Sequence, residues 1–133
     1  MRKKITYGLL TILLIGGLYL VLRFAFGLFT PLNYLSARHD IKNGKIQIVV
    51  LGEIFPTDKQ KQSLANTYGF EFYFFGCSIS TEIINGSKYY NQTMVDFLEK
   101  KYGSGWWTKF QTQLDSIDKS NTTTIINKNN KLD

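Results

Sequence analysis

Residues 45–53 read KIQIVVLGE, and residues 70–76 read FEFYFFG. The first segment is almost continuously apolar from Ile46 to Leu51 and rich in β-branched residues, a pattern typical of a strand buried on both faces. The second segment is dominated by aromatic side chains, which also favour strands. We therefore expect two strands, and the fold depends on how they are joined.

The segment between these strands is predicted to be a helix. Thr57 and Gln60 fit a capping box, in which each side chain satisfies a free amide of the first helical turn. Gly69 can supply the left-handed residue that ends the helix. A strand, a helix and a strand within about thirty residues is the signature of a right-handed parallel βαβ unit.

Two further helices are expected near the C-terminus. Apolar residues recur at spacings of three and four over 90–102, where Gly103 ends the run, and again over 107–117. Residues 119–133 are polar, although the β-branched stretch 122–126 could add an edge strand. Because a two-stranded sheet is marginal alone, helices, a third strand or a partner must cover it. The expected class is α/β, or α+β.

The N-terminal region contains ITYGLLTILLIGGLYLVL, residues 5–22, without a single charge. A helix of that length spans about 27 Å, close to the thickness of a bilayer's hydrocarbon core. Arg23 can extend its guanidinium to the lipid headgroups, which leaves 24–29 as an interfacial segment. We therefore expect residues 5–29 to contact the lipid bilayer.

Three alternatives to an uncleaved anchor fit this segment less well. A cleaved signal peptide has a shorter apolar core and a small-residue cleavage site, and no such site follows here. A lipoprotein needs a cysteine directly after the apolar stretch, but the chain's single cysteine is Cys77. A buried core helix usually has a polar face, which this segment lacks.

The orientation of the anchor follows from its flanking charges. Arg2, Lys3 and Lys4 precede the span, and the next basic residue after Arg23 is Arg38. The positive-inside rule therefore predicts a cytoplasmic N-terminus, with the rest of the chain outside the cytoplasmic membrane. The chain then divides into four parts: the cytoplasmic tip and transmembrane anchor (1–29), a juxtamembrane helix or linker (30–44), a small α/β domain (45–118) and a polar tail (119–133).

The overall charge of +6 does not indicate a nucleic-acid-binding protein. Four basic residues and no acidic ones lie in the first 29 positions, and the other twelve basic residues face ten acidic ones. No dense basic stripe of the kind that a phosphate backbone requires is present. One cysteine and one histidine also argue against a disulfide or a transition-metal site, and no motif indicates a cofactor.

Cys77 is the strongest candidate for chemistry, because ligands bind beyond the carboxyl ends of parallel strands. Those ends are Gly52-Glu53 and Gly76-Cys77-Ser78, which neighbouring strands would bring together. Glu53 could then act as a base, with His39 as another candidate. A helix starting near Ser80 could lower the pKa of the thiol and favour a nucleophilic thiolate. A small cysteine buried in a turn is the alternative that the sequence favours.

Three residues are candidates for binding contacts. Trp106 is expected to point away from the apolar stripe that contains Trp107, and so to be available to a partner. Tyr89 and Ser78 complete the set. An exposed sheet edge is a further candidate surface.

A short motif near the C-terminus resembles that of the small bacterial FEKKY-domain proteins. The residues that carry the resemblance are Leu98-Glu99-Lys100-Lys101-Tyr102-Gly103, Trp106 and Phe110, with Tyr68-Gly69-Phe70, Gly76-Cys77 and Tyr90-Asn91 as further landmarks. This sequence departs from the motif because Leu98 stands between Phe97 and Glu99. The resemblance covers residues 45–118. It implies a short, membrane-anchored bacterial protein and implies no activity.

Two functional hypotheses follow. The preferred one is a single-span protein of a bacterial cytoplasmic membrane that displays a small extracytoplasmic binding or accessory domain. Its partner would be another envelope protein or a second copy of the chain. The alternative is a thiol-dependent enzyme or redox protein that uses Cys77, and the sequence favours the non-enzymatic reading because no motif places a dedicated base.

Overall fold

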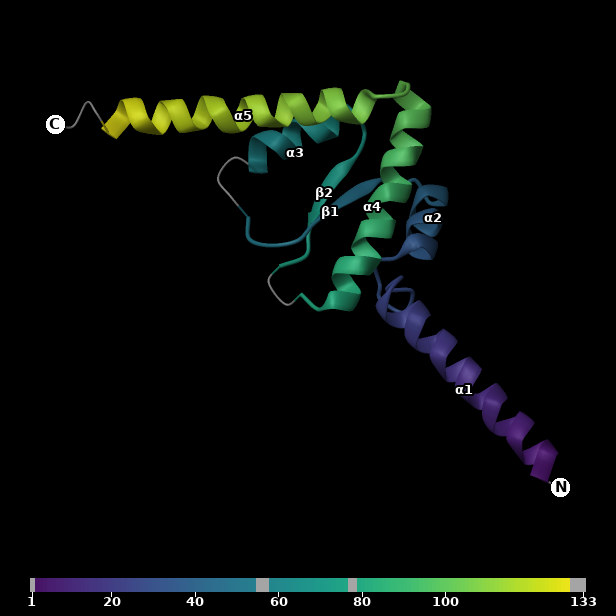
Figure 1. Cartoon of the computed structure of the whole chain (residues 1–133). Helices are drawn as coiled ribbons and strands as arrows, with labels where there is room; N and C mark the ends of the chain where they lie inside the picture. The colour runs from purple at the N-terminus through teal and green to yellow at the C-terminus, as the bar shows by residue number, and fades with distance from the viewer. Residues whose placement is uncertain (1, 55–57, 77–78, 130–133) are drawn as a thin grey trace.

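The computed structural model of the chain describes residues 2–54, 58–76 and 79–129, and side chains from residue 5 to residue 120 within these ranges (Figure 1). The elements, in chain order, are α1 (Arg2–Phe24), α2 (Tyr34–Lys42), β1 (Gln47–Val50), α3 (Asp58–Thr67), β2 (Glu71–Phe74), α4 (Thr81–Tyr102) and α5 (Trp106–Asn129). Helices therefore dominate a mixed helix-and-strand fold. The apolar N-terminal helix projects away from the rest of the chain (Figure 1).

The two strands lie where the sequence predicted them, and they pair in parallel. Gln47 pairs with Glu71 at one end of the register, and Val50 pairs with Phe74 at the other. The carboxyl ends of both strands therefore lie at the same edge of the sheet. Helix α3 lies between the strands in the sequence and packs against β2. A right-handed βαβ unit for this segment stays a prediction.

Helix α4 covers the sheet and forms the centre of the core. It packs against α2, β1 and α5, and Figure 1 shows it crossing the middle of the domain. Tyr90, Met94 and Leu98 recur at four-residue spacing and are completely or almost completely buried. They contact a core completed by Leu32, Ala37, Ile48, Val49, Ala65, Phe70 and Phe110. Burial of this helical face stabilises the small sheet.

Both outer edges of the sheet receive hydrogen bonds from side-chain amides. Asn91 on α4 accepts from the Val49 amide (2.8 Å) and donates to the Val49 carbonyl (2.7 Å). On the other edge, Gln62 on α3 accepts from the Phe72 amide (2.9 Å). The expected open sheet edge is therefore wrong at these positions, because neighbouring helices supply the bonding groups that an added strand would offer.

A buried polar contact links α2, β1 and α4. The hydroxyl of Tyr90, a fully buried residue, donates to an Asp40 carboxylate oxygen at 2.7 Å. The Gln47 side chain bonds the same hydroxyl. Burial, together with the bond to Asp40, raises the pKa of Tyr90 above its ordinary value, and the bond from Gln47 partly opposes this rise.

Two expected boundaries differ from the observed ones. The juxtamembrane helix or linker was expected over 30–44, but the helix, α2, begins only at Tyr34 and is capped by Asn33. The possible strand at 122–126 is also wrong, because these residues continue α5. Once a helix is nucleated, each added residue gains a backbone hydrogen bond, which outweighs a weak β preference. The predicted capping residue Thr57 lies outside the described residues.

Candidate functional site

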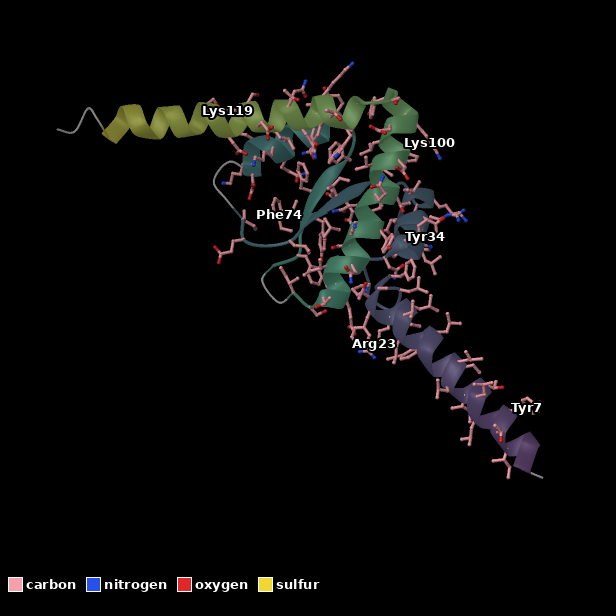
Figure 2. All side chains as sticks on the ribbon, viewed as in Figure 1. Tyr7, Arg23, Tyr34, Phe74, Lys100 and Lys119 are labelled. Carbon is pink, nitrogen blue, oxygen red and sulfur yellow. The ribbon has the colours of Figure 1, made fainter. Side chains whose placement is uncertain are left out.

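Helix α1 is apolar along most of its length, yet its described side chains are largely exposed. Its segment Ile5–Phe24 has 20 residues, a mean hydropathy of 2.2 and no residue buried against the described part of the chain. Figure 2 shows its side chains projecting freely on all sides below Arg23. The helix is therefore long and apolar enough to cross a membrane.

The C-terminal end of α1 is fixed to the N-terminal end of α4 by polar contacts. The Arg23 guanidinium donates from Nε to Glu82 Oε1 at 2.7 Å, and from Nη1 to the Tyr19 hydroxyl at 3.0 Å. The Asn85 amide donates to the carbonyl of Phe24 at 2.7 Å. The Arg23–Glu82 ion pair is exposed and contributes little alone, but the bond from Asn85 satisfies a carbonyl that the helix end leaves free.

Two glycines allow the chain to cross α4 at very close range. A Cβ on Gly86 would clash with the Thr30 hydroxyl and the Leu32 carbonyl. A Cβ on Gly27 would clash with the backbone of Glu82 and Gly86, and Gly27 also has a left-handed φ of 55°. Neither position accepts a larger residue without moving the backbone.

The segment between α1 and α2 is held by the side chain of Asn33. Its amide donates to the carbonyls of Leu28 (2.9 Å) and Thr30 (2.6 Å). Its oxygen accepts from the amides of Leu35 (2.8 Å) and Ser36 (3.1 Å), which caps α2. One buried side chain thus bonds both the turn and the helix start, and the connection is ordered structure rather than a loose tether.

The candidate catalytic residues are only partly described. Cys77 and Ser78 lie outside the described residues. Glu53 is exposed beyond the carboxyl end of β1. His39 lies in the last turn of α2, before the amino end of β1, and its Nε2 lies 2.8 Å from Asn43 Nδ2. The length of β1 therefore separates His39 from Glu53, and the structure does not bring these two together.

Two of the three candidate binding residues are described: Tyr89 lies in the first half of α4, and Trp106 is the first residue of α5. Tyr89 is 36% exposed, and its ring stacks on Phe26 with 5.4 Å between centroids. Trp106 was expected to point away from the core, and this is wrong. Its ring stacks on Tyr102 (5.0 Å) and Phe110 (5.2 Å) and meets Tyr68 edge to face (5.1 Å). The end of α3 approaches the end of α4 here, so Trp106 fills the space between them.

Comparisons of the chain with protein-family models, curated proteins and solved structures give no match. The FEKKY resemblance therefore stays a prediction. Among the described residues, no three His, Cys, Asp or Glu side chains gather in a way that could hold a metal ion.

The sequence alone did not predict the junction between α1 and the rest of the fold. Arg23 and Glu82 are 59 positions apart, so no local pattern joins them. One signal in the sequence was Gly86, which lies inside a predicted helical segment. Because glycine disfavours helix, an internal glycine often marks a place where another backbone approaches closely.

Proposed function

We propose that this chain is a single-span protein of a bacterial cytoplasmic membrane. It displays a small extracytoplasmic domain that acts as a binding or accessory module toward another envelope protein or a second copy of the chain. The observation that carries the proposal is the contrast along α1. Its apolar segment is not buried against the described part of the chain, whereas its last turn is bonded to α4.

The junction between α1 and the domain determines whether the domain is attached to the anchor rigidly or flexibly. A flexible linker would let the domain sample many heights above the bilayer, but here Asn33, Asn85 and the Gly27–Gly86 contact fix the connection. The domain therefore stands at a set distance and orientation from the membrane surface. Such placement suits contact with another membrane-bound surface.

Topology is the first test. Alkaline phosphatase fused after residue 133 is expected to be active, because the enzyme matures only outside the cytoplasm. The matched control carries the same fusion but lacks residues 5–24, and it should be inactive. Activity only from a cytoplasmic reporter at the same position would contradict the proposed orientation.

Thiol chemistry at Cys77 is a second candidate, supported by the sheet geometry. Parallel pairing of Val50 with Phe74 makes the segments that lead to Glu53 and Gly76 leave the same sheet edge. Helix α4 then starts at Thr81, capped by Ser80. A reactive Cys77 predicts fast alkylation of the native chain with a midpoint well below pH about 8.5. Labelling only after denaturation would contradict this candidate.

A further inference from the structure

An apolar hollow of about 290 Å³ opens where the anchor meets the domain. Its lining residues are Leu22, Phe26, Leu28, Tyr34 and Tyr89, contributed by α1, the following turn, α2 and α4. Leu22 belongs to the candidate membrane span itself. In the proposed topology, this hollow is therefore continuous with the hydrocarbon surface of the bilayer.

A second hollow, of about 470 Å³, follows along the groove between α2 and α4. It is lined by Tyr34, Arg38, Ile41, Lys42, Thr93, Asp96, Phe97 and Lys100. Three cations thus face one carboxylate, and Asp96 accepts a hydrogen bond from Gln92 (2.9 Å). Glu99 borders a neighbouring hollow together with Asp96 and Lys100. The second hollow carries a net positive charge.

Tyr34 lines both hollows and joins them. Its hydroxyl accepts from Arg38 Nη1 at 3.2 Å, and the Arg38 guanidinium lies 5.7 Å from the centre of the Tyr34 ring. In Figure 2, Tyr34 lies between Arg23, at the end of the anchor, and Lys100. The groove therefore changes from apolar to cationic with distance from the membrane helix.

The dimensions of the groove match one lipid molecule. Along α4, Tyr89 and Lys100 are separated by about 16 Å at the helical rise. One leaflet of a bilayer has a hydrocarbon depth of about 15 Å. A lipid whose acyl chain lies against Tyr89 can therefore place its headgroup between Arg38 and Lys100.

We propose that the groove between α2 and α4 binds a single anionic phospholipid of the host membrane. The acyl chain occupies the apolar hollow beside Leu22, and the phosphate lies near Arg38, Lys42 and Lys100. Continuity with the anchor selects a bilayer lipid over a soluble anion, and the charge selects an anionic headgroup. This inference rests on the proposed membrane anchoring, because the anchor would hold the groove between α2 and α4 next to the bilayer.

Native mass spectrometry of the full chain in detergent tests the proposal. The purified protein is titrated with dioleoylphosphatidylglycerol or dioleoylphosphatidylcholine. We expect one retained phosphatidylglycerol per chain, with a dissociation constant at least tenfold lower than that for phosphatidylcholine. Equal affinity for the two lipids would overturn the proposal. So would a dimer, formed at this face, that lipid does not displace.

Variants separate the two ends of the groove. R38A/K42A is expected to abolish the preference for phosphatidylglycerol, whereas the matched double variant K59A/K109A removes two exposed lysines elsewhere and should keep it. Y34A/Y89A should weaken binding of both lipids. All six positions are exposed, so folding should persist, and circular dichroism checks this. Retained preference in R38A/K42A would overturn the headgroup assignment.

Glycerol phosphate at millimolar concentration distinguishes a lipid from a free phosphate. It should not displace the bound phosphatidylglycerol, because it lacks the acyl chain. Displacement would show that the site recognises a soluble anion. The measurement in detergent does not depend on topology. An inactive phosphatase fusion with retained lipid preference would therefore contradict the orientation alone, and the reverse result would contradict only the lipid site.

Discussion

Val49 lies on the edge of β1 that faces α4, and both of its backbone polar groups are bonded by the Asn91 side chain. An amide is well suited to this position because it carries one donor and one acceptor group at fixed separation. The carboxylate of an aspartate could accept from the Val49 amide, but it would face the Val49 carbonyl without a proton to donate. The fit is therefore specific to asparagine at this length.

Replacement of Asn91 by alanine is expected to lower the free energy of unfolding by about 2–4 kcal/mol, because it leaves a buried amide and a buried carbonyl unsatisfied. Thermal unfolding of the full chain in detergent measures the loss. N91D should be comparably destabilised. Q92A, at an exposed neighbouring position, is the control and should change stability by less than about 0.5 kcal/mol. Wild-type stability of N91A would show that the two bonds contribute nothing.

Tyr90 should make stability depend on pH in the alkaline range. Because its pKa is raised in the folded state, the unfolded chain releases the phenolic proton first. The stabilisation is complete below the unfolded-state pKa of about 10 and falls as the pH rises above it. Y90F removes this dependence. Its unfolding free energy should be lower at neutral pH by about 1–2 kcal/mol, since Asp40 loses a donor, but should fall less steeply above pH about 10.

Urea unfolding at a series of pH values tests the Tyr90 prediction. Y73F changes an exposed tyrosine and should follow the wild-type alkaline profile. A profile of Y90F with the same alkaline slope as the wild type would contradict the assignment.

At the scale of elements, the crossing of the α1–α2 connection over α4 depends on Gly86. G86V is expected to push the turn at Thr30 and Leu32 away from α4, because the added side chain has no space. Overpacking of this kind costs about 1–3 kcal/mol. Spin labels at Leu18 and Thr108, in a chain with Cys77 replaced by serine, should show a narrow distance distribution that broadens in G86V.

The control for this prediction is K88V. It places the same β-branched residue at an exposed position of the same helix, so it tests a valine in α4 without the clash. Because lysine is a better helix former than valine, K88V weakens the helix itself, whereas G86V does not. A distance distribution in G86V as narrow as that of K88V would show that the connection does not depend on the close approach.

The second contact between elements is the aromatic cluster at the far end of α4. Trp106 stacks on Tyr102 and Phe110, and the Tyr102 hydroxyl donates to the Tyr68 carbonyl at 2.6 Å. W106A should therefore destabilise the fold by about 3–5 kcal/mol, as expected for truncation of a large packed ring. W106F should recover much of this loss. If W106A unfolds at the wild-type temperature, the cluster is not a structural element and Trp106 is available for binding.

At the scale of the whole molecule, the features that could be predicted from the sequence were those that depend on a local pattern of residues. The runs at 45–53 and 70–76 carry enough β-branched and aromatic residues to identify the strands, and the charge-free N-terminal run identifies the long apolar helix. Contacts between distant segments carry no local pattern. For that reason the Arg23–Glu82 pair, the Asn91 bridge and the packing of Trp106 emerged only from the structure. Extension of α5 through 122–126 also escaped prediction, because weak propensities there favour strand.

The bonded junction has a mechanical consequence. A single membrane helix changes its tilt when the bilayer becomes thinner or thicker, since tilting adjusts its hydrophobic length to the hydrocarbon. If a flexible linker joined the helix to the domain, a change in helix tilt would not change the orientation of the domain. Here Arg23, Asn85 and the Gly86 contact join the helix to the domain, so the domain must lean whenever the helix leans. In the proposed membrane topology, a change in bilayer thickness would therefore change the orientation of the domain relative to the membrane surface.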